Sequence, residues 1–206
     1  IDLYTYGEGQ TSAGFWTLMA DSWAGFPLGF RPGALDPMHL DEWGWLRPLL
    51  VTNPRQVYTA RIGQASRFPS APDLVRGVKI ELPDIPLSPP VQQHGRQRYG
   101  LTHNYYLQWR NTRTSGGYDA ALGDTRFRFG PANTGLLVWY QNDRYWDNSI
   151  ADYLDDPPSF GPKGKLLVVD AHPEPDHDPY WLERGVSTER GIVFSRGSMR
   201  DAPFSR

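Results

Sequence analysis

The sequence predicts an α+β fold in which strands predominate. Among 206 residues there are 19 Pro and 21 Gly, which favour many turns, together with 8 Trp and 11 Tyr, which are enriched in strands. Residues 78–82 (VKIEL) alternate apolar and polar side chains, as a half-buried strand does. Residues 135–140 (GLLVWY) form a continuous apolar run, which is typical of a strand buried on both faces.

One short helix is predicted over residues 35–46. Asp36 suits the N-cap position and Pro37 suits the first helical position. The negative charges of Asp41 and Glu42 favour the early turns of a helix.

The apolar side chains of this predicted helix define its buried face. Leu40, Trp43 and Leu46 recur at helical spacing and would share that face. His39 lies next to this stripe, and we expect it to be exposed or to take part in capping the helix.

The remaining strands are expected to be short and separated by loops. The predicted strands begin near residue 48, break at Asn53-Pro54, and continue at 56–62, 78–82, 105–111, 135–140 and 165–169. Residues 83–90 carry four Pro, so they are predicted to be a surface connection or polyproline II segment. Residues 92–99 are predicted to be a polar, basic loop.

Composition excludes several classes of function. The net charge is -2 with both signs interspersed, which gives no electrostatic footprint for nucleic acid. No apolar run approaches the roughly 18 residues that a membrane span requires. The chain has no Cys, so disulfides and thiolate metal sites are excluded, although export is not.

Residues 1–19 do not by themselves carry the ligand pattern of a zinc peptidase. A zinc peptidase needs three protein ligands, an open position for water, and a carboxylate base. Two His and the Glu usually stand together as H-E-x-x-H on one helix face. None of the five His in this chain has those partners. Taken alone, Asp2 is as readily a solvated carboxylate or a helix cap, and the run at 14–19 is as readily ordinary core.

Two segments near the N-terminus carry a family resemblance. Asp2-Leu3-Tyr4 and the run GFWTLM at 14–19 resemble the immune inhibitor A family of secreted, metzincin-like zinc metallopeptidases. In that family HExxHxxGxxD is followed by Leu-Tyr, then by a Gly-rich polar loop and Gly-Phe-Trp-x-Leu-Met. On this alignment Asp2 resembles the third zinc ligand and Met19 resembles the methionine of the Met-turn. The chain would be the C-terminal portion of such a protein, starting at the third zinc ligand.

Later segments resemble the same family in the same order. They are Tyr-Tyr-Leu at 105–107, Gly-Tyr-Asp at 117–119, Gly-Leu-Leu at 135–137, Asp-Ala-His-Pro at 170–173, and the stretch 201–205. The resemblance implies a metzincin-like lower subdomain over residues 1–50, with the Met-turn and the short helix. It implies a β-rich region over residues 51–206 packed on that subdomain.

The resemblance also implies a function. A zinc-bound water would hydrolyse peptide bonds of a protein or peptide substrate outside the cell. The general-base Glu and two His ligands would lie on a helix upstream of Ile1. Three explanations are open: the sequence is truncated, a partner chain or a cleaved half of the precursor supplies the helix, or the protein has lost it. The last alternative makes the protein a secreted, noncatalytic, β-rich binding module with an aromatic surface for polysaccharide or protein.

Two further clusters of polar residues suit metal binding. Asp and Asn gather between residues 143 and 156, and oxygen ligands at close spacing suit Ca²⁺, with Asp147 and Asn148 as the candidate ligands. The same residues are also the usual residues of turns. His172 and His177 stand among carboxylates, yet the three Pro there keep the segment stiff, so its side chains would not converge on a metal. This favours a turn in which Asp170 and His172 make buried hydrogen bonds.

Overall fold

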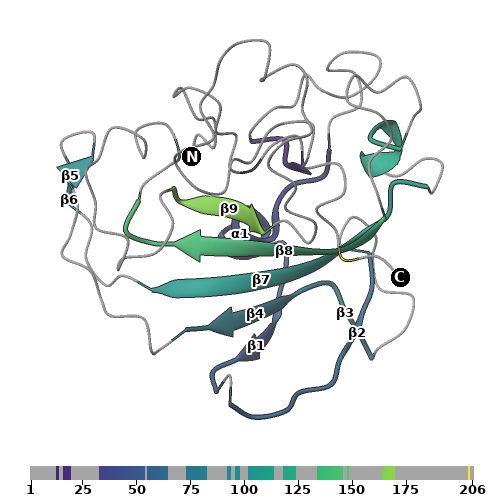
Figure 1. The fold of residues 1–206 in the computed structure, drawn as a ribbon, viewed down its shortest axis with the longest axis horizontal. Helices are drawn as coiled ribbons and strands as arrows, with labels where there is room; N and C mark the ends of the chain where they lie inside the picture. The colour runs from purple at the N-terminus through teal and green to yellow at the C-terminus, as the bar shows by residue number, and fades with distance from the viewer. Residues whose placement is uncertain are drawn as a thin grey trace, which may run out of the picture.

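The computed structural model contains one central sheet with little helix (Figure 1). It describes residues 13, 16–19, 33–53, 55–64, 73–82, 92–93, 96–97, 102–113, 118–123, 134–145, 148, 164–169 and 204. The expectations for Asp2, Asp147, Asp170, His172 and the segment 83–90 lie outside these residues. Within the described part the strand-rich α+β prediction is confirmed.

The central sheet has five strands in the order β1-β4-β7-β8-β9. Its members are β1 (Leu49–Val51), β4 (Val78–Glu81), β7 (His103–Arg110), β8 (Gly135–Asn142) and β9 (Leu166–Val169). The β1–β4 pair is parallel, and the other three pairs are antiparallel. Each of these strands coincides with a predicted strand, because period-2 or continuous apolar patterns are strong local signals.

Two smaller pairs of strands lie outside this sheet. β2 (Arg61–Ile62) and β3 (Leu74–Val75) pair in parallel. β5 (Gln92–Gln93) and β6 (Arg96–Gln97) pair antiparallel. The prediction of an irregular loop at 92–99 is wrong at these four residues, since polar side chains do not prevent two short segments from pairing through their backbones.

The predicted helix is α1 (Pro37–Glu42), with Asp36 at the N-cap and Pro37 at the first position. It ends earlier than predicted because Gly44 adopts a positive φ of 73° and turns the chain. The amide nitrogens of Trp45 and Leu46 then both donate to the carbonyl of Leu40.

Early termination of α1 changes which of its side chains are buried. Leu46 is buried as predicted, but Trp43 is 45% exposed. His39 is buried, and so is Met38. The expected burial of Trp43 is therefore wrong, because the six-residue helix ends before residue 43. Of the two alternatives for His39, exposure is wrong and participation in capping is confirmed, since its amide donates to the side chain of the N-cap Asp36. Asp41 and Glu42 fall in the last turn of α1, not in its early turns.

The two faces of the central sheet differ in how they are covered. Along β7, Asn104, Tyr106, Gln108 and Arg110 are buried, whereas Tyr105, Leu107 and Trp109 between them are partly exposed. The Tyr106 hydroxyl reaches Asp41 of α1, so the buried set faces the helix. We call this the helix-side face and the other the open face.

One hydrophobic core lies on the helix-side face. It comprises Ala13, Trp16, Met38, Tyr106, Leu122, Leu137, Trp139, Leu166 and Val168, with Met19 packed against it. Residues from both sides of position 50 therefore share one core. The division into a lower subdomain and a β-rich region stays a prediction.

Candidate functional site

Residues 16–19, which carry the predicted Met-turn, form a bend against the core. Trp16 and Thr17 are fully buried, Leu18 is 42% exposed, and Met19 packs against the buried cluster. The amide of Trp16 donates to the carbonyl of Ala13 at 3.4 Å, and the amide of Met19 donates to Thr17 Oγ1 at 3.3 Å. The bend thus holds Met19 at the edge of the core.

Asp36 connects this bend to α1. Its Oδ2 accepts hydrogen bonds of 2.7 Å from the Thr17 hydroxyl and from Nδ1 of His39, and its Oδ1 accepts from the amide of His39 at 2.9 Å. The amide of Asp36 in turn donates to Thr17 Oγ1 at 3.3 Å. All three side chains are buried, so this carboxylate both caps the helix and fixes the bend.

The segment that leads into α1 is held at consecutive residues by buried polar side chains. Besides the contacts of Asp36, the amide of Ala34 donates to Asp119 Oδ1 at 3.0 Å. The carbonyl of Leu35 accepts from the Gln108 side chain at 3.3 Å. Because Gln108 belongs to β7 and Asp119 to the 3₁₀ helix η3 (Tyr118–Ala121), the sheet and η3 together place the start of α1.

A buried ion pair lies beneath this segment. Arg110 and Asp119 are each 1% exposed, and two donor–acceptor contacts join them, Nε to Oδ2 at 2.7 Å and Nη2 to Oδ1 at 2.5 Å. Arg110 Nη1 also donates to Gln108 Oε1 at 3.0 Å, and its guanidinium stacks 5.5 Å from the centre of the Trp16 ring. The bidentate geometry keeps both charges paired out of water.

The Nε2 atom of the buried His39 has the environment of a metal ligand or a base. The Asp36 carboxylate at Nδ1 favours the tautomer with its proton on that atom, which leaves the lone pair on Nε2. Nε2 is buried and has no hydrogen-bond partner among the described residues. The Trp43 ring packs 5.4 Å from the imidazole, centre to centre. A His with a carboxylate on one ring nitrogen is the arrangement that suits a metal ligand or a base.

The described residues do not by themselves assemble a zinc site. No group of three His, Asp or Glu side chains among them lies close enough to hold a metal ion. Asp2, the one predicted zinc ligand of this chain, lies outside the described residues. A zinc site would therefore need ligands from beyond the described part of the chain.

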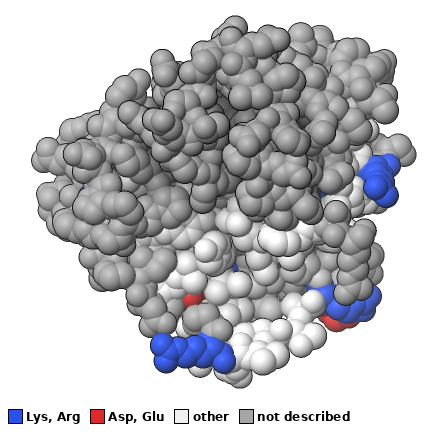
Figure 2. Space-filling view, in the orientation of Figure 1, with Lys and Arg blue, Asp and Glu red and all other residues white. Residues whose placement is uncertain are grey.

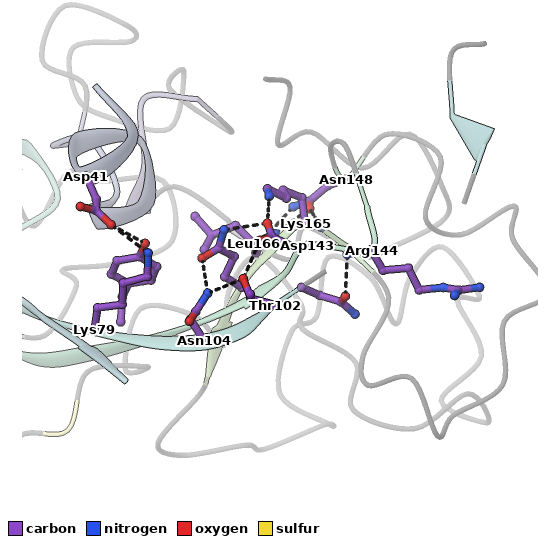
Figure 3. A network of polar contacts seen from close by, with 12 residues as sticks. Asp41, Lys79, Thr102, Asn104, Asp143, Arg144, Asn148, Lys165 and Leu166 are labelled. Carbon is purple, nitrogen blue, oxygen red and sulfur yellow. Dashed lines mark hydrogen bonds and ion pairs between the residues drawn. The ribbon is translucent and has the colours of Figure 1, made fainter. Parts of the chain in front are cut away.

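A second polar network lies on the helix-side face, toward the other end of β7 (Figure 3). Asp41 Oδ2 accepts from Lys79 Nζ at 3.1 Å and from the Tyr106 hydroxyl at 2.9 Å. Burial and the neighbouring Asp41 carboxylate raise the pKa of Tyr106 far above its ordinary value, so the phenol keeps its proton and acts as a donor. These contacts tie α1 to β4 and β7.

Asp143 is the centre of the rest of this network (Figure 3). It accepts hydrogen bonds from the Thr102 hydroxyl at 2.7 Å, from the Gln141 amide at 2.8 Å, and from Lys165 Nζ. Lys165 is fully buried, so the carboxylate provides the charge that compensates for its burial. Asn104 donates to both Thr102 and Gln141. The network joins β7, β8 and the start of β9.

Asn148, a candidate calcium ligand, fastens β9. Its Oδ1 accepts from the amides of Lys165 at 2.6 Å and Leu166 at 3.1 Å, and its Nδ2 donates to the carbonyl of Leu166 at 2.9 Å. Calcium would have to compete with both amides for this oxygen. The calcium site at Asp147 and Asn148 stays a prediction.

His103 and Tyr140 form a buried pair at the end of β7. The Tyr140 hydroxyl lies 2.7 Å from His103 Nδ1, and the rings are stacked with centres 5.9 Å apart. Burial lowers the pKa of His103, opposed by the Asp143 charge, and burial raises the pKa of Tyr140 to about 12. Both residues are therefore neutral near pH 7.

The sequence pointed to the bend but missed what holds it. The resemblance predicts Met19 as the methionine of the Met-turn, whereas the sequence predicts no role for Thr17, Gln108 or Arg110. An N-cap Asp three residues before a His is a local signal that predicts the Asp36–His39 contact. No local signal predicts Thr17 with Asp36 or Ala34 with Asp119, because those partners are 19 and 85 residues apart in the chain.

Comparison with known proteins gives one partial relationship. A stretch of 73 residues, 35% of this chain, is 42% identical to Immune inhibitor A from Bacillus thuringiensis subsp. alesti. That stretch covers 9% of the relative, so this chain matches only a small part of it. No family model matches the chain. In the described part no helix is long and apolar enough to span a membrane.

Proposed function

We propose that this chain is part of a secreted zinc-dependent endopeptidase and supplies the segment beneath the metal. The observation that carries the proposal is the 42% identity with Immune inhibitor A. The buried bend that presents Met19 beside the core supports it, because a Met-turn requires a methionine held rigidly under the metal site.

The proposal assigns roles to four residues of this chain, Asp2, Thr17, Met19 and Asp36. Asp2 would be one of three protein ligands of the zinc, and the two His ligands and the general-base Glu would come from a helix outside this sequence. Zinc would supply an activated water. Thr17 and Asp36 hold the bend, and Met19 contributes the hydrophobic floor.

The first experiment measures the intact mass and the zinc content of the native purified protein, together with hydrolysis of casein. We expect a mass above 23.4 kDa or a co-purifying second chain, near-stoichiometric zinc, and activity that 1,10-phenanthroline removes. Asp2→Ala should lose zinc and activity together. The matched control is Asp73→Ala, whose half-exposed carboxylate pairs with exposed Arg61; this substitution should leave both unchanged. A lone 23.4 kDa species without zinc or activity would refute the proposal.

A second candidate function is a noncatalytic binding module. Trp43 and Trp45 favour it, because they are 45% and 60% exposed and their rings meet edge to face with centres 5.1 Å apart. Exposed aromatic rings of this kind stack on sugar rings or on apolar protein surfaces. A pull-down with insoluble polysaccharides, comparing Trp45→Ala with the exposed but isolated Val57→Ala, tests this function. If the polysaccharide retains both variants and the unchanged protein equally, the aromatic pair is not the binding site.

A further inference from the structure

A hollow of about 350 Å³ lies on the open face of the central sheet. Its floor is made by Val78, Ile80 and Leu107, together with Leu49 and Val51 of the edge strand β1. In the register of the sheet Val78 pairs with Leu107 and Ile80 with Tyr105, whereas Lys79 pairs with Tyr106 on the helix-side face. The hollow is thus on the opposite face from Met19 and its bend.

The other wall of the hollow is the segment between β1 and β2 together with the end of β2. It contributes Gln56, Tyr58, Ala60 and Ile62. The Tyr58 hydroxyl lies 3.4 Å from Gln56 Oε1, which is a long hydrogen bond at an exposed position. Either group is therefore available to a ligand at little cost. No charged side chain lines the hollow among the described residues.

The backbone of this wall is exposed along residues 57–60. Each of the four residues is exposed, and Val57 is 90% exposed. No backbone hydrogen bond joins 57–60 to another described residue. The segment belongs to no helix or strand and runs directly into β2 (Figure 1). It therefore offers backbone donors and acceptors beside an apolar hollow.

We propose that an extended polypeptide binds here, pairing its backbone with residues 57–60 and inserting one large apolar side chain into the hollow. Addition of a strand to an exposed sheet edge, with pockets for side chains, is a general mode of peptide recognition. Here residues 57–60, which lead into β2, would take the place of that edge. This site is separate from the proposed zinc site and does not depend on the peptidase proposal.

Size and charge favour this occupant. The volume lies near the lower limit of about 300 Å³ for ligand pockets, which suits one side chain better than a large cofactor. Figure 2 shows that the described surface over β1 to β4 is mostly uncharged, with Lys and Arg at its margins. An apolar anchor flanked by small polar residues therefore fits better than a charged anchor.

The test titrates isotope-labelled native protein with capped pentapeptides and follows amide shifts by NMR. The reference peptide is Lys-Thr-Phe-Thr-Lys, and the comparison peptides carry Gly or Lys in place of Phe. We expect saturable shifts of the amides at 57–60 and of those in β1 and β4. Both comparison peptides should bind about tenfold or more weakly, because burial of the Phe side chain is lost. Methylating the amide nitrogens of the two Thr should weaken binding similarly, since the paired donors are removed.

Protein variants separate the hollow from the surrounding surface. Ala60→Phe places a ring at the mouth of the hollow and should reduce affinity about tenfold or more. Thr52→Ala changes an exposed side chain that neither lines the hollow nor belongs to residues 57–60, and it should leave affinity unchanged. Both substitutions are at exposed positions, and equal thermal unfolding midpoints would show that both variants fold.

Three outcomes would overturn the proposal. One is equal binding of the Phe and Gly peptides, which would mean that no side chain enters. Another is equal binding of methylated and unmethylated peptides, which would mean that no backbone pairing occurs. The third is unchanged affinity in Ala60→Phe. All three readouts are independent of zinc and of peptidase activity, so failure here is distinguishable from failure of the proposed function.

Discussion

The Thr17 hydroxyl donates a 2.7 Å hydrogen bond to Asp36 Oδ2, and both side chains are fully buried. This bond links the bend at 16–19 to the first turn of α1. Asp36 serves Thr17 and His39 through the same oxygen, so loss of either partner leaves a buried carboxylate less well compensated.

Thr17→Val should destabilise the protein by about 1 to 3 kcal/mol, because the isosteric side chain removes one of the buried donors to the Asp36 carboxylate. Urea unfolding monitored by Trp fluorescence measures the change. Thr102→Val is the matched control, since its hydroxyl bonds Asp143 at an exposed position and should cost less than about 1 kcal/mol. Equal effects of the two substitutions would contradict the role assigned to Thr17.

Arg110→Met should destabilise by about 3 to 5 kcal/mol, because it leaves the Asp119 carboxylate buried without its cation. Asp119→Asn should also destabilise, by removing the charge that Arg110 requires. The double variant should cost clearly less than the sum of the two single variants. Strict additivity in a double-mutant cycle would show that the two charges do not interact in solution.

Asn148→Ala should destabilise by about 1 to 3 kcal/mol, because three backbone groups of residues 165 and 166 lose their partner. Asn53→Ala is the matched control, since Asn53 Oδ1 accepts from the Arg55 amide at an exposed turn. Thermal unfolding with Ca²⁺ and with a chelator tests the calcium prediction in the same experiment. A midpoint that Ca²⁺ raises in the native protein, and not in Asn148→Ala, would support it.

The stability of the protein should fall on acidification through pH 6.5, in part because of His103. Burial lowers the pKa of His103 in the folded protein below its ordinary value of 6.5, while the Asp143 charge opposes this effect. Below pH 6.5 the His103 side chain binds a proton more readily in the unfolded chain than in the folded protein, so acid stabilises the unfolded state. Above pH 6.5 the side chain is neutral in both states, and this loss of stability vanishes.

The measurement for His103 is the urea midpoint at several values between about pH 5 and about pH 8, within the range where His titrates. His103→Gln should show a shallower loss of stability on acidification than the native protein. Contributions from the rest of the chain are common to both proteins and cancel in the comparison. Parallel pH profiles would show that His103 is not responsible.

Local sequence patterns are enough to predict the individual elements of this fold. An N-cap Asp followed by Pro gives the start of α1, and alternating or continuous apolar runs give β4, β7, β8 and β9. These patterns reflect backbone geometry and burial that act over a few residues. The predicted end of α1 is too late, because Gly44 stops the helix within its predicted span.

The candidate site is held together by contacts between residues that are distant in the chain. Residues 34–36 receive their partners from Asp119, Gln108 and Thr17, which lie far away in the chain. A polar side chain looks the same in the sequence whether it is solvated or buried. Its role depends on whether folding removes it from water, since a buried group must then find a partner from another part of the chain.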